Sequence, residues 1–491
     1  MIHFPVSKNK SKVFIMQPKI LITACLSLLL LSGCVPKMDK AVPLSDMTIN
    51  ADLEKMSRDF DDERLVRDWW KMYGDEQLNG IIEEALAKAP SIQSLEAKFA
   101  QANTIIQSVE SRNLPHLSAN ASVIRERFSE NHIFPPPLGG GTYTQYQPEL
   151  MLEYDFDFWN ERSSHISAAK NTALAQRATI EASKIALSSA LCETYIAWHY
   201  EEQKLSILNA LDRTTREELK IVEKQYALGL IDAIALNDKK SAQMQIAQRM
   251  EELKRSIEGK KEAICVLGGF LPSYAETLRT PTIKHGFNLP LPKEVMLNLV
   301  AHRSDVAIAK YTALSKSYTI EQTKAQFYPN ISLSGLIGFT SFNWSKLMDH
   351  SSYSPSAGIA VSLPLLDWGM RKANLQNSVS DYNASVYEYN QAVIKAANEV
   401  VVLLKQTKLI QSQLQLHDRE MNAKKGNETI ECKKLFLGLS DKLPYLSAKK
   451  TVYEGEMDTL SLNETKSLIQ INLIKALGGG YVLKEDKNAS R

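Results

Sequence analysis

The sequence contains one long pattern twice. Residues 159–162 (WNER) correspond to residues 368–371 (WGMR), and residues 227–232 (ALGLID) correspond to residues 436–441 (FLGLSD). Both landmarks repeat after 209 residues, from position 159 to 368 and from position 229 to 438. Repetition at a fixed spacing indicates an architecture of repeated units. We therefore expect one structural body made of two related halves.

Each half contains a stretch that is too long for a helix in a globular core. No glycine or proline occurs between residues 161 and 226, and the matching stretch 372–435 contains only Gly426. At about 1.5 Å per residue, the first stretch would form a helix about 100 Å long. Small residues recur along it every four or seven positions, a spacing that favours close, coiled-coil-like packing. The sequence therefore predicts an elongated and mostly α-helical protein.

A glycine and an aspartate follow each long stretch. Gly229 and Gly438 are placed as C-terminal helix caps, where glycine adopts the left-handed conformation at little cost. Asp232 and Asp441 follow them and can cap the next helix. Partner helices are predicted over residues 232–267 and 441–477, so the chain should form two helical hairpins.

Each half also carries two predicted strands before its long helix. In the first half they cover residues 117–128 and 150–158, with a loop at 129–145. The second strand alternates apolar with mainly acidic residues, a pattern typical of a strand with one face toward water. In the second half, Ile331, Leu333 and Leu336 mark one strand. After a loop at 343–352, apolar residues alternate from 359 to 365, with Pro364 near the strand end. Four strands cannot close a barrel alone, but three chains would supply twelve.

The N-terminus has the pattern of a secretion signal. An apolar run at 20–31 follows a basic segment and ends in the residues LSGC, with Cys34 last. This ending resembles the bacterial lipobox, which implies cleavage before Cys34 and lipidation of that cysteine. Val35 at the next position implies an outer-membrane destination. Met16 is an alternative start to Met1.

These patterns predict six segments. They are a signal peptide (1–33), a lipidated tether (34–65), a first structural repeat (66–271), an equatorial linker between the repeats (272–295), a second structural repeat (296–480) and a C-terminal tail (481–491).

Charge and motifs argue against several classes of function. Lys and Arg (58) nearly balance Asp and Glu (56), so no basic surface for nucleic acid is expected. The sequence has no nucleotide-binding loop, nucleophile elbow or paired metal-binding histidines, and we expect neither an enzyme nor a metal or other cofactor. Asp155 and Asp157 are interpreted as facing water inside a pore rather than as metal ligands. Cys192, Cys265 and Cys432 are interpreted as buried, unpaired thiols, with a disulfide as the alternative.

Over residues 65–481 the chain resembles the TolC-like outer-membrane factors of efflux and type I secretion systems, most closely their lipoprotein branch of NodT, OprM and CusC type. The segments that carry the resemblance are 70–75 (WKMYGD) with Leu78, 158–160 (FWN), 226–230 (YALGL), 303–306 (RSDV), 325–333 (AQFYPNISL) and 476–481 (ALGGGY).

The resemblance implies a homotrimer in which a 12-stranded outer-membrane β-barrel continues into a periplasmic α-barrel. It implies that an inner-membrane pump and a periplasmic adaptor dock at the helical tips, here Gly229, Leu230, Gly438 and Leu439. In OprM-like members a leucine ring and an aspartate ring narrow the bore, and these positions fall on Leu443 and Ser447. Ser447 is not acidic and so departs from the pattern of the aspartate ring. Asp441 and Asp238 are the alternative residues for that ring. The chain also has Ser304 in place of a common proline and Tyr481 in place of a common tryptophan.

The expected function is therefore a passive exit duct for drugs or metals. An outlet for type I protein secretion has the same architecture and is the first alternative. A lipid-anchored coiled-coil adaptor without a pore is the second, although it would not need membrane-spanning strands. The sequence does not identify the cargo.

Overall fold

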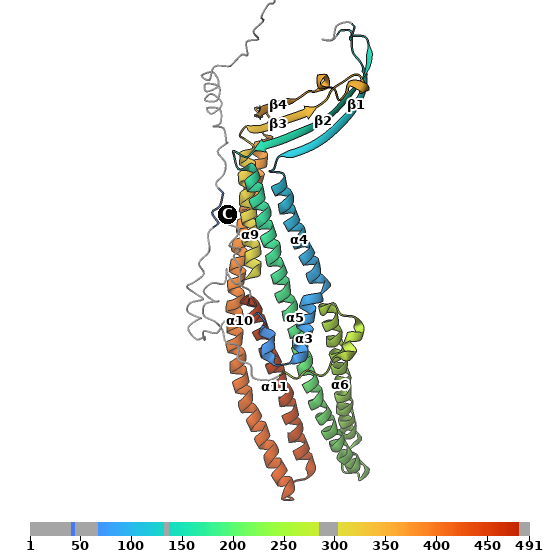
Figure 1. Ribbon diagram of the computed structural model, residues 1–491. Coiled ribbons are helices and arrows are strands. Elements are labelled where there is room, and N and C mark those ends of the chain that lie inside the picture. Colours follow the sequence, from blue (N-terminus) through green and yellow to red (C-terminus); the bar gives the residue numbers. More distant parts are fainter. Residues whose placement is uncertain (1–40, 45–66, 132–136, 284–302, 481–491) are drawn as a thin grey trace, which may run out of the picture. The chain divides into compact units, whose positions relative to one another are not determined.

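The computed structural model describes residues 41–44, 67–131, 137–283 and 303–480, and most of them are helical (Figure 1). The α-helices are α3 (Glu76–Lys88), α4 (Pro90–Ser111), α5 (Glu161–Ala227), α6 (Ala233–Gly268), α9 (Ser304–Ala325), α10 (Met370–Phe436) and α11 (Lys442–Ala476). The strands are β1 (His116–Arg127), β2 (Thr142–Phe156), β3 (Asn330–Gly338) and β4 (Ser356–Ser362). The short 3-10 helices are η2 (Trp69–Tyr73), η3 (Pro272–Thr277), η4 (Trp344–Lys346) and η5 (His350–Ser352).

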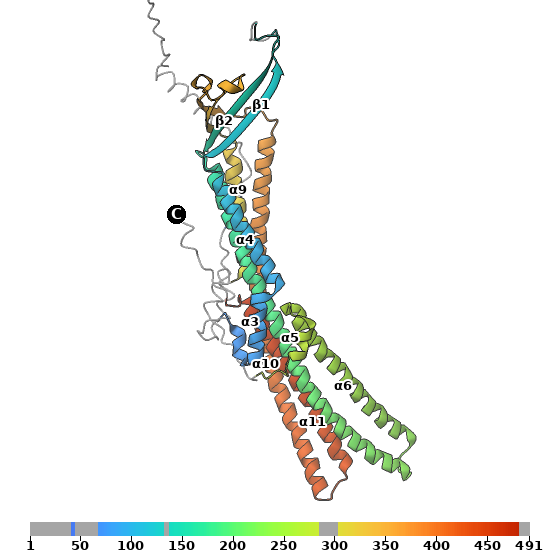
Figure 2. The same ribbon diagram turned by 45° about the vertical axis from the view of Figure 1, so that its right-hand side comes forward.

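The duplicated sequence pattern gives duplicated elements. α5 and α10 each contain 67 residues, and each is followed by a shorter antiparallel helix, α6 and α11 respectively (Figure 2). Each half also contributes two strands before its long helix. The predicted fold class, mostly α with four strands per chain, is confirmed.

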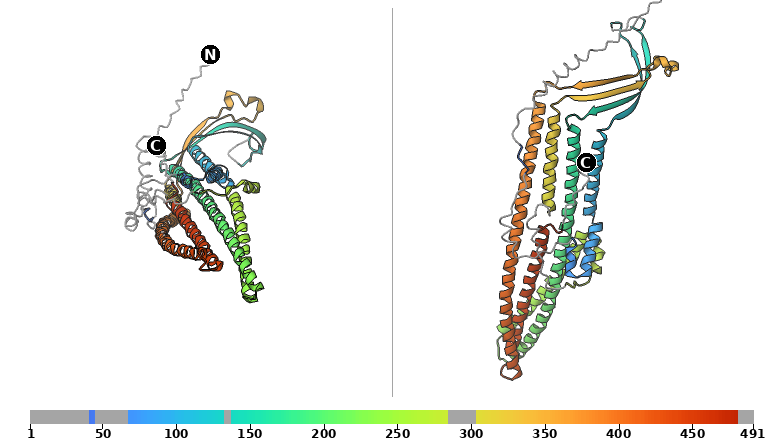
Figure 3. Two further views of the ribbon diagram at one scale, coloured as in Figure 1. Left: turned by 90° about the horizontal axis from the view of Figure 1, so that it is seen from below. Right: turned by 60° about the vertical axis from the view of Figure 1, so that its left-hand side comes forward.

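The chain divides into two compact units. The first contains residues 1–42, 106–169 and 315–383, and the second contains residues 43–105, 170–314 and 384–491. The first unit holds a curved four-stranded sheet, in which the strands follow one another in the order β1-β2-β3-β4 and every neighbouring pair is antiparallel (Figure 3). β1 and β4 are the two edges of this sheet.

The core of the second unit surrounds a run of aromatic residues. Trp69 of η2 and Trp198 of α5 are fully buried there, together with Ile264 of α6 and Ile471 of α11. Helix α3 joins this core through Leu78 and its neighbours. Burial of large side chains from five elements explains why this part of the chain holds together, since each such side chain contributes about 1.5–3 kcal/mol.

Asp75 connects three segments of the second unit. Its carboxylate caps α3 by accepting hydrogen bonds from the backbone N–H groups of Gln77 (2.9 Å) and Leu78 (3.2 Å). It also accepts hydrogen bonds from the hydroxyl group of Tyr195 on α5 (2.9 Å) and from the backbone N–H of Thr282 (2.7 Å). Burial, followed by the nearby charge of Asp75, raises the pKa of Tyr195 above its ordinary value. The Asp75 carboxylate therefore ties the start of α3 to α5 and to the segment around Thr282.

Arg303 connects three helices of the same unit. It lies just before α9 and donates hydrogen bonds to Asp305 (3.0 and 2.8 Å), to Glu399 of α10 (2.9 Å) and to the backbone carbonyl of Ala476 in α11 (2.6 Å). Burial opposes the charge on Arg303, but the two carboxylates outweigh burial and raise its pKa. Ser304 fits the first position of α9. The missing proline is therefore compatible with the helix start.

Several boundaries differ from the sequence prediction. β2 begins at Thr142, so the predicted loop 129–145 is shorter, and β4 ends at Ser362, before the last positions of its predicted strand. The loop at 343–352 contains the two short helices η4 and η5. Cys192 and Cys265 are buried and unpaired as predicted, but Cys432 is exposed, so its predicted burial is wrong.

Several predicted segments lie outside the described residues. These are the signal peptide, the lipidation site Cys34, nearly all of the tether, the linker beyond residue 283 and the C-terminal tail. None of the described helices is both long and apolar enough to cross a membrane.

Candidate functional sites in the sheet and at the helical tips

The sheet has one apolar face and one polar face. Successive side chains of a strand point to opposite faces, so the pairing register assigns each residue to a face. The apolar face carries mainly Leu117, Ala119, Ala121, Val123, Tyr146, Leu150, Leu152, Tyr154, Phe156, Ile331, Leu333, Ile337, Ala357, Ile359 and Val361, and its polar exceptions Arg125, Arg127, Thr142 and Thr144 lie at the end next to the loop between β1 and β2. The opposite face carries mainly Ser118, Asn120, Ser122, Gln145, Gln147, Glu149, Glu153, Asp155, Ser332, Ser334, Ser356 and Ser362, with Ile124, Tyr143, Met151, Leu336 and Ala360 as exceptions.

The apolar face is exposed in the single chain. Leu117, Val123 and Ile359 are each at least 65% exposed. A contiguous apolar surface of this extent marks contact with another protein or with lipid. A sheet with apolar and polar faces is also what a pore wall requires, because one face meets lipid and the other meets water.

Aromatic side chains gather at both ends of the sheet. At the end with the strand-connecting loops, the rings of Phe128, Tyr143 and Phe342 lie 5.4–5.9 Å apart, and Tyr146 lies 5.2 Å from Trp344. At the other end the close pairs are Tyr154–Phe156, Phe156–Phe158 and Trp159–Tyr328. Membrane-spanning strands carry such aromatic girdles at both lipid–water interfaces.

Two arginines fix the junctions between strands and long helices. Arg162 of α5 pairs with Asp155 of β2, and Arg371 of α10 pairs with Asp367 (2.7 Å). Asp157 accepts the backbone N–H groups of Arg162 (3.1 Å) and Ser163 (2.9 Å), and it therefore caps α5. Burial opposes the charge on Asp157, but the hydrogen bond from the Ser163 hydroxyl, followed by those from the backbone N–H groups, outweighs burial and lowers the pKa of Asp157. The interpretation of Asp157 as a pore-facing strand residue is wrong, because β2 ends one residue earlier.

The same hydrogen-bond pattern ends both long helices. At the first tip, Gly229 N–H donates to Tyr226 (2.9 Å) and Leu230 N–H donates to Gln225 (2.9 Å). At the second tip, Gly438 N–H donates to Leu435 (3.1 Å) and Leu439 N–H donates to Lys434 (2.8 Å). Both glycines have positive φ, 70° and 67°, as the Schellman cap requires.

The two tips expose apolar side chains. Leu228, Leu230, Leu437 and Leu439 are each at least 66% exposed. No neighbouring atom lies within 4 Å of the position a Cβ would take on Gly229 or Gly438. Asp232 and Asp441 follow the tips and cap α6 and α11, as predicted. Each tip is therefore a capped turn that presents exposed apolar side chains.

Near the tips a buried glutamate holds the two hairpins together. Glu218 of α5 is 5% exposed and accepts hydrogen bonds from Lys239 of α6 (2.5 Å) and Lys450 of α11 (2.8 Å). Burial opposes its charge, but the two lysines outweigh burial and lower its pKa. The neighbouring Glu217 pairs with Lys442 at an exposed position. Glu218 could not be predicted from the sequence, because no local motif marks a residue whose partner Lys450 lies 232 positions away.

The two predicted constriction residues lie on the first turns of α11. Leu443 is half-buried and Ser447 is exposed. Asp441, the alternative acidic residue, has its carboxylate engaged in capping α11. A bore would require further copies of the chain, so the constriction remains a prediction.

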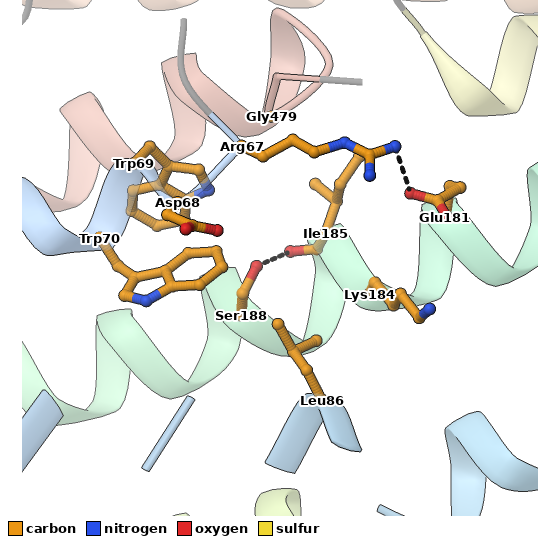
Figure 4. A pocket seen from close by; sticks show the side chains of 10 residues that line it. All are labelled: Arg67, Asp68, Trp69, Trp70, Leu86, Glu181, Lys184, Ile185, Ser188 and Gly479. Atoms are coloured by element: carbon orange, nitrogen blue, oxygen red, sulfur yellow. Dashed lines mark hydrogen bonds and ion pairs between the residues drawn. The ribbon is translucent and has the colours of Figure 1, made fainter. Parts of the chain in front are cut away.

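A pocket open to solvent lies in the second unit (Figure 4). Trp69 and Trp70 form one side of it, and Glu181, Ile185 and Ser188 of α5 lie opposite (Figure 4). The charged groups at its rim are paired, Arg67 with Glu181 at 3.6 Å and Lys184 with Glu96 at 3.5 Å. The pocket brings no nucleophile and base together. Among the described residues no three His, Cys, Asp or Glu side chains form a potential metal site.

A family model described as outer membrane efflux protein matches residues 81–264 and 297–479. Among curated proteins, the multidrug resistance outer membrane protein MdtQ of Escherichia coli is 25% identical over 93% of this chain and 98% of its own length. The multidrug resistance outer membrane protein MdtP of Escherichia coli is 23% identical over 84% of this chain and 86% of its own length.

Solved structures share the fold. The outer membrane protein VceC of Vibrio cholerae has a TM-score of 0.76 and 24% identity, and covers 84% of this chain and 98% of its own. The CmeC outer membrane channel of Campylobacter jejuni has a TM-score of 0.79 and 20% identity, and covers 92% of this chain and 96% of its own.

Proposed function

The chain belongs to the outer membrane efflux protein family, and from this premise we propose that three copies of it form the passive outlet of a tripartite efflux system. The observation that carries this proposal is the sheet with two different faces and two open edges, β1 and β4. An unpaired edge in lipid leaves backbone N–H and C=O groups without partners, which costs several kcal/mol per group. Edge-to-edge pairing of three such sheets gives a closed, even-numbered barrel of twelve strands.

In this arrangement the polar face lines the bore. Serine, glutamine and glutamate side chains on that face keep the pore wet, while the apolar face and its aromatic girdles contact lipid. The channel needs no cofactor, because transport through it is passive and the energy comes from a pump. Cys34 carries the lipid that anchors each chain to the outer membrane.

The tips are the docking surface for a periplasmic adaptor. Exposed leucines beside a rigid glycine turn, in particular Gly229 with Leu230 and Gly438 with Leu439, give a small apolar contact that a partner can bury. An inner-membrane pump completes the system. Leu443 and Ser447 narrow the periplasmic end of the bore, where a hydrophobic ring resists wetting and blocks ions.

Drugs are the favoured cargo, because the curated relatives are named as multidrug resistance proteins. An outlet for protein secretion has no specific observation in its favour. A pore-free adaptor would leave the two-faced sheet and its aromatic girdles without a role.

Planar bilayers test the proposal. We expect discrete single-channel currents from purified protein, and larger ones from Leu443→Ala, which loosens the proposed constriction. In cells, Gly438→Pro removes the N–H that closes the second tip and should abolish efflux while trimers persist. Bilayers that stay silent even with the Leu443 variant would favour a pore-free protein.

A further inference from the structure

Two arginines interrupt the apolar face of the sheet. Among the residues of the four strands, Arg125 and Arg127 of β1 are the charged side chains on that face, and both lie at the end next to the loop between β1 and β2. At the opposite end the same face carries uncharged partners such as Phe156 and Ile331. The charge on this face of the strands is therefore positive and is confined to one end.

The pairing register places Arg125 just beyond an aromatic contact. Val123 pairs with Tyr146, whose ring lies 5.2 Å from that of Trp344. The aromatic girdles of membrane-spanning strands lie at the boundary between hydrocarbon and headgroups. Arg125 is two residues beyond Val123, which is about 6.4–6.8 Å along a strand and about 5 Å in height for a strand tilted by about 35–45°. Because the headgroup region is about 5–8 Å deep on each side of a bilayer, Arg125 falls within it.

The guanidinium of Arg125 is free to bind a ligand. Its side chain is exposed, and it forms no hydrogen bond or ion pair with any residue that the structure describes. Thr144 is its partner across the strands and adds a hydroxyl group on the same face. Arg127 differs, because its Nε donates to the carbonyl of Gly140 (3.1 Å) and one of its terminal nitrogens pairs with Glu130 (3.2 Å). Of the two arginines, Arg125 is therefore the one that remains available.

An arginine at this position suits a phosphate group. The aliphatic part of its side chain can lie along the apolar face while the charged end reaches the headgroups. The planar guanidinium can donate two parallel hydrogen bonds to a phosphate, and these are stronger than hydrogen bonds between neutral groups. Acidic side chains of the strands, such as Glu126 and Glu149, lie on the polar face, so they do not repel an anion bound to the apolar face.

We propose that Arg125, with Thr144 beside it, binds the phosphate group of a lipid in the outer leaflet of the outer membrane. This inference rests on the proposed function, because it places the sheet in the membrane with the strand-connecting loops outside. α5 and α10 begin at the other end of the sheet, at Glu161 and Met370, and that end faces the periplasm. Each chain contributes one such site, so a trimer has three.

Lipid titrations test the proposal. Trimers purified in a neutral detergent are titrated with lipid A that carries two phosphate groups, and native mass spectrometry measures the bound lipid. Arg125→Gln should weaken binding about fivefold and Arg125→Glu about 25-fold, since each positive charge near an anionic lipid surface contributes a factor of about five. Arg112→Gln is the matched control and should leave the affinity unchanged, because Arg112 is an exposed arginine just before the other end of β1.

A conservative variant and two further ligands identify what the site recognises. Arg125→Lys keeps the charge but cannot form the paired hydrogen bonds, so its affinity should fall less than that of Arg125→Gln. The same lipid without phosphates should bind the unaltered protein about fivefold more weakly, and Arg125→Gln should abolish that difference. Excess inorganic phosphate should not displace the lipid, because it lacks the acyl chains that contact the apolar face.

The outcomes distinguish the two proposals. Equal affinities of the unaltered protein and Arg125→Gln, an equal loss in Arg112→Gln, equal binding of the lipid without phosphates, or displacement by inorganic phosphate would each overturn the lipid-phosphate site and leave the channel intact. The mass spectra report the trimer together with the bound lipid, so a variant that fails to assemble is recognised and Arg125→Lys takes its place. Absence of trimers or of channel currents from the unaltered protein would instead contradict the proposed function.

Discussion

Replacement of Glu218 tests whether a buried charge cluster joins the two hairpins near their tips. Glu218→Ala leaves Lys239 and Lys450 without the carboxylate that both contact. Loss of one partner of a buried ion pair costs about 3–5 kcal/mol. The side chains of Lys239 and Lys450 are 39% and 22% exposed, respectively. Water can therefore solvate part of the positive charge that the substitution leaves unpaired. We expect a loss of about 2–3 kcal/mol after this discount.

The neighbouring Glu217 provides a matched control. It pairs with Lys442, but both side chains are nearly half exposed, 46% and 44%. An exposed pair of this kind contributes about 0–1 kcal/mol. Glu217→Ala removes the same number of atoms and the same charge one position away, so the difference between the two variants isolates burial.

Hydrogen exchange is the appropriate assay, because it reports the free energy of local opening. A loss of about 2–3 kcal/mol corresponds to exchange that is faster by a factor of about 30–150 in the first turns of α11. Glu217→Ala should change these rates by less than about fivefold. Equal rates in both variants, or wild-type rates in Glu218→Ala, would refute the argument.

The effect also depends on pH in a defined direction. The folded pKa of Glu218 is lowered below the ordinary carboxyl value of 4.5, so the unfolded state binds more protons in acid. The stabilisation is complete above about pH 4.5 and is lost as the pH falls through the folded pKa. The difference between wild type and Glu218→Gln should therefore shrink in acid and remain constant from pH 6 to 8.

Four further variants test other parts of the structure. Gly455→Ala should destabilise the second hairpin by about 1–3 kcal/mol in denaturant titrations, because the new Cβ would lie 2.3 Å from the sulfur of Met421. The control Gly426→Ala, which has open space around it, should instead stabilise α10 by about 0.5–1 kcal/mol. An equal change in the free energy of unfolding for both variants would contradict the packing at Gly455. Leu439→Arg should abolish efflux in a drug-sensitivity assay with trimers intact, and unchanged efflux would remove the second tip from docking. Cys34→Ala should prevent incorporation of labelled lipid, and persistent labelling would contradict the lipobox assignment.

Local signals explain why the helical part of the fold could be predicted. Gly229 and Gly438 end their helices with a backbone pattern that glycine favours, and the two aspartates that follow cap the next helices. These features depend on a few neighbouring residues.

Long-range contacts explain what was missed. β2 extends back to Thr142 through residues 142–149, which are polar except for Tyr143, Tyr146 and Pro148; the two tyrosines are three positions apart, so no apolar period of two marked this part of the strand. Glu218 meets its partners only after the two hairpins pack together. The docking tips and the constriction at Leu443 and Ser447 remain predictions, because their role depends on partners and on further copies of the chain.

The most direct test of the account asks whether the outer strands of neighbouring chains pair. One cysteine is introduced in each edge strand, Ala119→Cys in β1 and Ala357→Cys in β4, in a Cys432→Ser background, and outer membranes are treated with a maleimide cross-linker of about 8 Å. The two positions lie three strand spacings apart in one sheet, about 14 Å, so this linker is too short to join them within a chain. If three chains close one barrel, the linked products end at three chains. Products that extend beyond three chains, or monomer alone, would contradict it.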